Sequence, residues 1–275
     1  MTPRVVLTIA GSDSSGGAGI EADLRTFAAL GVLGAVALTA ITAQNTTTVS
    51  AVLAVEPEMV VEQVRAVTND LEVAAVKTGM LARPATVAAV AGLAARGILP
   101  RLVVDPVLVS STGHPLMEVG GIDAYRDLLL PHAAVATPNL REAALLCGID
   151  VDELSSIEQM AAAGAMIRSL GAQAVLVKGG HLLDGGATAL RAPDVLVSED
   201  GVVLLDAVRI ETGNDHGTGC SLASAIAVGL AGGLAVEAAV RRAKAFVHEA
   251  LQGAATWRVG SGHGPIDHLG WGPDA

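Results

Sequence analysis

Short apolar runs alternate with amphipathic segments along most of the chain. Apolar runs of about four to eight residues rich in Val, Ile and Leu are typical of buried strands, and longer segments with one apolar face are typical of helices. The expected strands cover residues 5–10, 35–42, 49–55, 73–77, 102–105, 134–137, 174–178, 194–198 and 202–208. The expected helices cover residues 20–30, 57–69, 84–96, 140–146, 155–170, 218–231 and 236–253.

This alternation predicts an α/β fold. Short hydrophobic strands separated by helices form a largely parallel central sheet with helices on both faces. The exception is the pair of strands around Glu199-Asp200-Gly201, which is typical of a hairpin turn. The sequence shows no internal repeat and no long linker, so we expect a single domain over residues 1–275.

Polar residues follow the ends of most of the expected strands. They lie at residues 11–13, 44–45, 77–80, 105, 137–139 and 178–181. In open α/β sheets, ligands bind outside the carboxyl ends of the strands. The recurrence of polar residues there favours a functional site over scattered surface positions.

Composition narrows the classes of partner. The net charge of −11 argues against nucleic acid or an anionic membrane surface as the main partner. The uncharged runs at residues 27–43 and 222–236 are interrupted by glycine or fall short of the roughly 20 apolar residues that a membrane span needs. Two cysteines, Cys147 and Cys220, are too few for a disulfide framework, and the first residues lack a signal-peptide pattern. We therefore expect a cytoplasmic protein.

The segment Gly213-Asn214-Asp215-His216-Gly217-Thr218-Gly219-Cys220 has the composition of an anion-binding loop. Closely spaced glycines let a ligand approach the backbone, and Thr218 can cap the helix that follows. The N–H groups and the positive dipole end at a helix start attract anions. Cys220 at this start is expected to have a lowered pKa and to be reactive. The alternative is a plain turn into a buried helix, with Cys220 as a small core residue.

The first loop fits a second glycine pattern. Residues 17–22 match a loose dinucleotide-binding fingerprint after a strand. That fingerprint also requires a carboxylate at the end of the next strand, where this chain has Gln44-Asn45. A nicotinamide-dependent enzyme is therefore a weaker alternative.

A set of short motifs spans nearly the whole chain. It comprises Gly11-Ser12-Asp13, Ser15-Gly16-Gly17-Ala18-Gly19-Ile20, Ala22-Asp23-Leu24, Ala43-Gln44-Asn45-Thr46, Lys77-Thr78-Gly79-Met80, Asp105-Pro106-Val107, Thr137-Pro138-Asn139-Leu140, Glu142-Ala143, Lys178-Gly179-Gly180-His181 and His216-Gly217-Thr218-Gly219-Cys220. From Val5 to about His268, the chain resembles the hydroxymethylpyrimidine/phosphomethylpyrimidine kinases of the ribokinase-like superfamily. This resemblance implies a ribokinase-like fold, a homodimer and a role in thiamine biosynthesis. The implied activity is two ATP-dependent phosphorylations, first of 4-amino-5-hydroxymethyl-2-methylpyrimidine and then of its monophosphate, which becomes the diphosphate.

The resemblance also assigns roles in phosphoryl transfer, which depends chiefly on positioning and charge stabilisation. The residues that hold the transferring group are Gly217, Thr218, Gly219 and Cys220, and a Cys220 thiolate would accept the proton of the hydroxymethyl group. Asp105 and Glu142 are the candidates for binding Mg²⁺ through water. Lys178, Lys244 and Asn139 are the candidates for binding ATP. The alternatives are a turn for Asp105, a surface salt bridge for Glu142 and a solvated helix face for Lys244.

For the pyrimidine, the resemblance points to Gln44, with a pocket lined by Gly11, Ala18, Asp23, Met80 and Val107. A glutamine amide has both donors and an acceptor for an aminopyrimidine edge. Met80 and Val107 offer apolar faces to a flat ring, although Met80 could equally fill a gap in the core. His181 and His216 also match the motifs, either as catalytic groups or as structural hydrogen-bonding residues.

One position departs from the resemblance. The family usually has Thr or Ser where this chain has Asp215. A carboxylate there repels nucleotide phosphates unless it faces magnesium or solvent. A ligand-binding protein without turnover therefore stays open as an alternative. Pyridoxal kinase activity is the other alternative, because relatives with the same anion loop share that chemistry.

Overall fold

The structure, a computed structural model, describes residues 2–109, 116–180 and 190–272. Its strands are β1 (Val5–Ala10), β2 (Leu33–Leu38), β3 (Ala40–Gln44), β4 (Val49–Ala54), β5 (Val73–Thr78), β6 (Val103–Val104), β7 (Val135–Ala136), β8 (Val175–Lys178), β9 (Asp194–Ser198) and β10 (Gly201–Leu205). Its α-helices are α1 (Gly19–Ala29), α2 (Pro57–Thr68), α3 (Pro84–Ala95), α4 (Gly121–Ala124), α5 (Leu140–Cys147), α6 (Ile157–Ser169), α7 (Thr218–Ala231) and α8 (Val236–Ala254). Three short helices of other types are η1 (Tyr125–Leu129), η2 (Leu130–His132) and η3 (Val151–Glu153).

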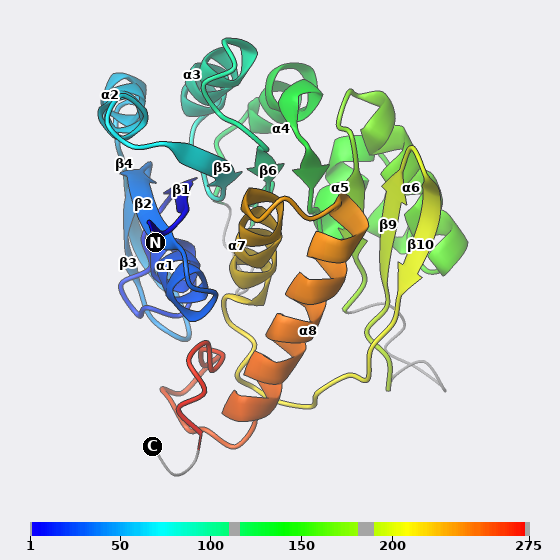
Figure 1. Ribbon diagram of the computed structural model, residues 1–275. Coiled ribbons are helices and arrows are strands. Elements are labelled where there is room, and N and C mark those ends of the chain that lie inside the picture. The colour runs from blue at the N-terminus through cyan, green and yellow to red at the C-terminus, as the bar shows by residue number, and fades with distance from the viewer. Residues whose placement is uncertain (1, 110–115, 181–189, 273–275) are drawn as a thin grey trace.

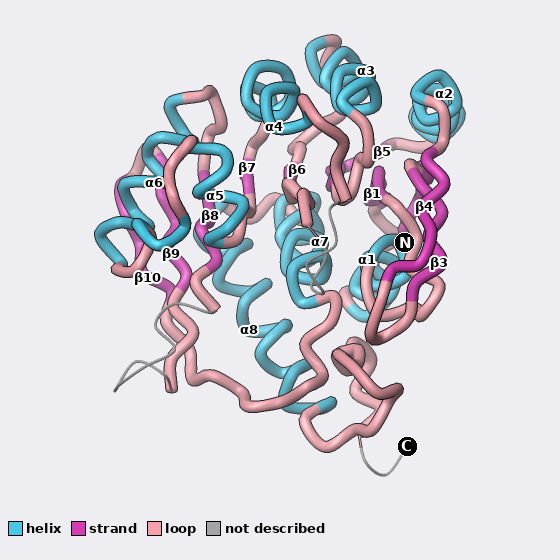
Figure 2. Tube along the Cα trace, turned by 180° about the vertical axis from the view of Figure 1, so that it is seen from behind, coloured by secondary structure: helices cyan, strands magenta, loops and turns pink. Residues whose placement is uncertain are grey.

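Eight of the strands form one sheet in the order β10-β9-β8-β7-β6-β5-β1-β2. The strands from β2 to β8 in this sheet are parallel, whereas β9 and β10 are antiparallel to their neighbours. Helix α8 lies in front of the sheet in Figure 1 and behind it in Figure 2, where α5 and α6 face the viewer. The expected α/β fold, with a largely parallel sheet and helices on both faces, is confirmed.

Alternate residues of the strands enter two different cores. Val6 of β1 belongs to the core that includes Phe27 of α1 and Ile226 of α7. Its neighbour Leu7 belongs to the core that includes Val60 of α2. Because successive strand residues point to opposite faces, a strand covered by helices on both sides must be apolar throughout. This explains the continuous apolar run at the start of the chain.

Helix α7 packs against both the sheet and α8, and all of its residues from Ser221 to Ala231 are buried. The uncharged run in this part of the sequence therefore belongs to a core helix. Within the described ranges, no helix combines the length and the apolar character needed to cross a membrane.

The expected strand at residues 35–42 is wrong as one element. The chain leaves the main sheet at Thr39, whose N–H donates to the Ala10 carbonyl at 3.0 Å and whose hydroxyl donates to the Met80 carbonyl at 2.6 Å. β2 ends before Thr39 as the edge of the main sheet, and β3 after it pairs with β4 in a separate two-stranded antiparallel sheet. Both halves have strand-forming sequences, so hydrophobicity alone cannot locate the change of sheet.

The helical stretch at residues 121–132 has no counterpart in the sequence-based prediction. There, α4, η1 and η2 follow one another, with Tyr125, Leu129 and Leu130 fully buried. The three pieces are short and differ in helix type, and Pro131 lies in the first turn of the last of them. Such pieces do not produce the regular apolar spacing by which helices are identified in a sequence.

A buried ion pair joins four elements below the carboxyl end of the sheet. Asp23 of α1 and Lys77 of β5 are both fully buried, and the Lys77 Nζ lies 2.8 Å from an Asp23 carboxylate oxygen. The hydroxyls of Thr8 in β1 and Ser224 in α7 donate to the same carboxylate at 2.6 and 2.7 Å. Burial alone would lower the pKa of Lys77, but the Asp23 carboxylate outweighs it and the pKa is raised.

Replacing Lys77 with Met should destabilise the fold strongly. Met fills a similar volume but leaves the Asp23 charge buried without a cation, and breaking a buried pair in this way costs about 3–5 kcal/mol of unfolding free energy. Urea denaturation measures the loss. The control is Arg65→Met, which removes a solvent-exposed pair with Glu62 and should cost no more than about 1 kcal/mol. Equal effects of the two substitutions would contradict the prediction.

Candidate active site

The start of helix α7 is shaped by Gly217. This residue caps the helix with a φ of 85°, in the left-handed region that favours glycine. A Cβ at this position would also collide with the carbonyl oxygen of Gly17 in the loop after β1. Thr218, expected as the cap, is instead the first residue of the helix. The amides of residues 218–220 lie at the helix start, where backbone N–H groups and the dipole favour an anion.

An ammonium group and a carboxylate lie beside this helix start. The Lys178 Nζ donates to Asp105 Oδ1 at 2.9 Å, and the Thr137 hydroxyl donates to the same oxygen at 2.9 Å. A Cβ built on Gly219 would lie 3.2 Å from the Lys178 Nζ and 3.9 Å from Asp105 Oδ2. The structure therefore brings Asp105, Lys178 and Gly219 together, as the motifs predicted.

Glu142 and Asn139 are hydrogen-bonded to each other at the start of α5. The Glu142 N–H donates to Asn139 Oδ1 at 2.9 Å, and the Asn139 N–H donates to Glu142 Oε2 at 2.8 Å, so the two residues form the capping box of α5. Burial raises the pKa of Glu142 to about 7, against the opposing effect of Lys178, and the nearby Asp105 charge adds to the rise. Glu142 is thus buried near the Asp105–Lys178 pair and is not a surface salt-bridge residue.

Lys244 reaches the same end of the sheet from α8. Its Nζ lies 2.5 Å from Asp194 Oδ2 and donates to the Ala192 carbonyl at 2.8 Å. The other Asp194 oxygen accepts from the Gly179 N–H at 2.9 Å. Lys244 is therefore half-buried and paired, which excludes a solvated helix face, and its role toward ATP stays a prediction.

The expectation of a lowered pKa for Cys220 is wrong. Burial raises the pKa of this thiol to about 11, although Lys77 opposes the rise, and the carboxylates of Asp23 and Asp105 add to it. The Gly19 N–H, at the start of α1, also forms a hydrogen bond with this side chain. Proximity to helix starts favours a thiolate only modestly, whereas burial and two neighbouring negative charges disfavour it more.

Gln44 lies against His216 and the loop after β1. Its Nε2 is 3.3 Å from His216 Nε2, which in turn lies 2.7 Å from Asp13 Oδ2. The Ser14 hydroxyl donates to the Gln44 carbonyl at 2.7 Å and accepts from its N–H at 2.8 Å. Asp13, Gln44 and His216 lie within the motifs and Ser14 does not, and no sequence pattern indicates that Asp13 and Ser14 hold Gln44 and His216.

The apolar residues assigned to the pyrimidine also come together. A Cβ on Gly11 would lie 3.3 Å from the Met80 Cε, so the side chain of Met80 covers this glycine. Met80 packs with Ala40 in a small cluster, and Val107 packs against the same cluster. Met80 is only 8% exposed. It therefore fills a gap in this cluster and also borders Gly11 in the loop after β1.

The position of Asp23 differs from that expected. Asp23 is fully buried, and its carboxylate accepts from Thr8, Lys77 and Ser224, so the structure does not present it to a ligand. The reason is its place on the inner face of α1, directly over the sheet. Ala18 stays in the loop, and its N–H donates to Asp13 Oδ2 at 2.8 Å.

The C-terminal segment, residues 255–272, closes this region and was not expected to do so. The His216 N–H donates to the Gly264 carbonyl at 3.0 Å, and the Gly264 N–H donates to the Gly213 carbonyl at 2.9 Å. His263 Nδ1 lies 2.6 Å from Asp215 Oδ1. The carboxylate that departs from the family pattern therefore has a partner in the C-terminal segment.

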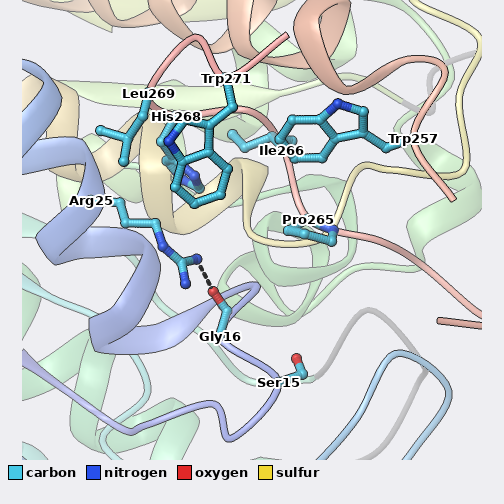
Figure 3. Close-up of a pocket in the computed structure, with 9 residues that line it drawn as sticks. All are labelled: Ser15, Gly16, Arg25, Trp257, Pro265, Ile266, His268, Leu269 and Trp271. Atoms are coloured by element: carbon cyan, nitrogen blue, oxygen red, sulfur yellow. Dashed lines mark hydrogen bonds between the residues drawn. The ribbon is translucent and has the colours of Figure 1, made fainter. Parts of the chain in front are cut away.

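A small cavity lies between this segment and the loop after β1 (Figure 3). Its volume is about 70 Å³ and its lining residues are Ser15, Gly16, Arg25, Trp257, Pro265, Ile266, His268, Leu269 and Trp271. The two indole rings stack with centroids 6.2 Å apart, and Arg25 donates to the Gly16 carbonyl. None of the residues that the sequence assigned to substrate, phosphate or metal lines this cavity. His181, the other motif histidine, lies outside the described residues.

Known proteins resemble the chain along most of its length. The sequence profile of the phosphomethylpyrimidine kinase family matches residues 13–267. A hydroxymethylpyrimidine/phosphomethylpyrimidine kinase of Rhizobium meliloti is 51% identical over 268 residues, which cover 96% of this chain and 97% of that protein. A pyridoxal kinase of Staphylococcus aureus, solved with AMP-PCP and pyridoxal, superposes with a TM-score of 0.87 at 35% identity, covering 98% of this chain and 95% of that one.

A solved phosphomethylpyrimidine kinase of Clostridium difficile is 38% identical and superposes with a TM-score of 0.77, covering 90% of this chain and 99% of that one. The profile match and the sequence relative each span nearly the whole chain, and the motif residues Asp105, Lys178 and His216 lie around one helix start in the structure. The chain therefore belongs to the phosphomethylpyrimidine kinase family.

Proposed function

We propose that this protein transfers phosphoryl groups from ATP to 4-amino-5-hydroxymethyl-2-methylpyrimidine and then to the resulting monophosphate. The observation that carries the proposal is the meeting of two groups of residues around the start of α7. Lys178 and Asp105 lie beside Gly219, and Gln44 lies against His216, next to Gly217. The group around Lys178 suits a phosphate chain, and the group around Gln44 suits a polar ring. The relative from Rhizobium meliloti, which carries the name of this activity, supports the same reading.

The helix start supplies the charge stabilisation that phosphoryl transfer requires. The N–H groups of Thr218, Gly219 and Cys220 hold the transferring phosphoryl group, because they lie at the positive end of the helix dipole. Lys178 adds a positive charge at 3.2 Å from the Cβ position of Gly219. The nucleotide is ATP, which is consistent with the AMP-PCP bound to the pyridoxal kinase of Staphylococcus aureus.

The carboxylates near this site fit a magnesium ion held mainly by phosphate and water. Within the described residues, no group of three or more His, Cys, Asp or Glu side chains could hold a metal ion by itself. Mg²⁺ is usually bound through one or two carboxylates, substrate phosphates and several waters. Asp105 and Glu142 would hold it through water beside the helix start. When bound, the ion would neutralise charge on the phosphates.

Gln44 suits a pyrimidine better than a pyridine ring. A 4-aminopyrimidine presents a ring acceptor and an amino donor side by side, and one glutamine amide can pair with both. Pyridoxal has no amino group next to its ring nitrogen. The fold likeness to the pyridoxal kinase of Staphylococcus aureus nevertheless makes pyridoxal the second candidate substrate.

The proposal extends to assembly and compartment. The β3–β4 ribbon lies outside the main sheet and exposes Ile41 and Leu53, the latter 67% exposed. Contiguous apolar surface of this kind is typical of protein interfaces, and a second copy of the chain is the occupant that we propose. Cys147 and Cys220 are both free thiols, which is consistent with a reducing cytoplasm.

Purified protein should phosphorylate the hydroxymethylpyrimidine and its monophosphate, and Gln44→Leu should lower kcat/KM for the hydroxymethylpyrimidine about tenfold or more, because the ring groups lose their partner. A coupled assay of ADP release at saturating ATP measures both, with pyridoxal as a third substrate.

The control is Gln252→Leu, an exposed position near the end of α8. Faster turnover of pyridoxal would favour the second candidate, and no turnover of any substrate would favour a ligand-binding protein. An unchanged Gln44→Leu variant would remove the substrate assignment.

Cys220→Ala should slow the two phosphorylation steps by similar factors, because a thiol with a pKa of about 11 does not act as the base of the first step. In a Cys147→Ala background, iodoacetamide should label Cys220 with a rate that titrates well above the usual thiol pKa of about 8.5. The alkylation rate is followed by mass spectrometry from pH 7 to pH 11. Titration below pH 8, or a loss confined to the first step, would show that Cys220 is a proton acceptor after all.

The parent protein should sediment as a dimer in analytical ultracentrifugation, and Leu53→Lys should shift it toward the monomer. A charge in the ribbon would have to be buried without a partner at the interface. The matched control is Leu128→Lys in η1, where the leucine is 43% exposed and lies outside the ribbon. A monomeric parent, or equal effects of both substitutions, would exclude the ribbon as the interface.

A further inference from the structure

The environment of the Gln44 amide contains a conflict between hydrogen-bond donors. Asp13 Oδ2 lies 2.7 Å from His216 Nε2 and also accepts from the Ala18 N–H at 2.8 Å. The other Asp13 oxygen accepts from the Ser15 N–H and hydroxyl at 2.9 and 2.7 Å. A carboxylate that accepts from all of these neighbours is ionised, and an ionised carboxylate can only accept. His216 Nε2 must therefore carry a hydrogen.

The charge state of Asp13 agrees with this argument. Burial would raise the pKa of Asp13, but the hydrogen bonds from His216, Ser15 and Ala18 outweigh burial and hold the pKa at about 2. The hydrogen on His216 Nε2 is required whether the imidazole is neutral or doubly protonated, so the protonation of the other ring nitrogen does not affect it.

With a hydrogen on His216 Nε2, a Gln44 NH₂ group at 3.3 Å would place donor against donor. On its other side, the Thr42 hydroxyl lies 3.4 Å from Gln44 Oε1 and donates to the Ser12 carbonyl at 2.9 Å, so its one hydrogen is divided between two acceptors. The contact with His216 is therefore mismatched in this orientation of the amide, and the contact with Thr42 is weak.

Turning the Gln44 amide by 180° exchanges its oxygen and nitrogen at nearly the same positions and removes the mismatch with His216. The one hydrogen on His216 Nε2 is then shared between Asp13 Oδ2 at 2.7 Å and Gln44 Oε1 at 3.3 Å, as in a three-centre hydrogen bond. The Gln44 NH₂ donates to the Thr42 hydroxyl, which keeps its own hydrogen for Ser12. Each bond in the chain from Asp13 to Ser12 then pairs a donor with an acceptor. The backbone of Gln44 is already fixed by Ser14 on both its N–H and its carbonyl.

We infer that Asp13 and His216 are positioning residues for substrate recognition, because they fix which edge of the Gln44 amide faces the ligand. One hydrogen of the NH₂ group and one lone pair of Oε1 remain for the ring, a fixed donor–acceptor pair that selects a ring acceptor next to an amino group. Gly17 is needed for this arrangement, because a Cβ there would collide with the His216 imidazole. This inference rests on the proposed function, in which Gln44 binds the pyrimidine.

Two substitutions of His216 test whether a donor is needed at the position of Nε2 or whether any polar side chain suffices. The amide nitrogen of Gln can take the place of imidazole Nε2, whereas that of Asn takes the place of Nδ1 and falls short of Asp13 and Gln44. Binding of the hydroxymethylpyrimidine without nucleotide is measured by isothermal titration calorimetry. His216→Asn should weaken binding about fivefold or more, and His216→Gln should restore most of the loss. His132→Asn, at an exposed histidine of η2, is the matched control and should bind like the parent.

A double-mutant cycle with Gln44→Leu tests whether His216 acts through Gln44. In the Gln44→Leu background, His216→Asn should weaken binding by less than about twofold, because the amide that it orients is gone. Equal losses in both backgrounds, or equal binding by the Asn and Gln variants, would overturn the inference and leave the proposed function intact. Full-strength binding by Gln44→Leu would overturn both.

The preference for the 4-amino group of the pyrimidine can be measured as well. The analogue that lacks the 4-amino group should bind the parent more weakly than the natural pyrimidine, and His216→Asn should reduce this preference because its Gln44 amide can turn. Thermal unfolding without ligand checks that the variants are folded. A variant that is folded and keeps the full preference would show that the amide is oriented without His216.

Discussion

The buried ion pair between Asp23 and Lys77 fixes the elements from which the site is built. It joins α1 to β5 directly, and through the hydroxyls of Thr8 and Ser224 it includes β1 and α7. The loop after β1, the residues after β5 and the start of α7 all leave from these four elements. Because a buried charge without its partner is strongly unfavourable, the pair tolerates little movement of one element relative to the others. The loops above it are therefore held on a rigid base.

Close contact between backbones then brings the loops together. Gly217 lies against Gly17, and His216 packs on the same glycine, so the loop after β1 and the loop before α7 approach more closely than side chains would allow. The C-terminal segment adds backbone hydrogen bonds to the second loop through Gly264. The site is thus made of three segments that are far apart in the sequence and depend on one another for their conformation.

The sequence was sufficient for the features that depend on local pattern. The apolar runs located most strands, and the motifs brought Asp105, Lys178 and Gly219 to one place. The features that it could not provide depend on three-dimensional burial. The fully buried state of Asp23 and the raised pKa of Cys220 follow from neighbours contributed by other elements, which no local spacing records. The change of sheet at residue 39 is of the same kind, since both adjoining strands have ordinary strand-forming sequences.

The stacked indoles of Trp257 and Trp271 have a spectroscopic consequence. They are the two tryptophans of the sequence, and both line the cavity between the C-terminal segment and the loop after β1. Emission excited at the red edge of protein absorption therefore originates almost entirely at this one place. Two indoles at a centroid distance of 6.2 Å also couple electronically and give a paired signal in circular dichroism. The chain thus carries an intrinsic optical label on the segment that closes its candidate active site.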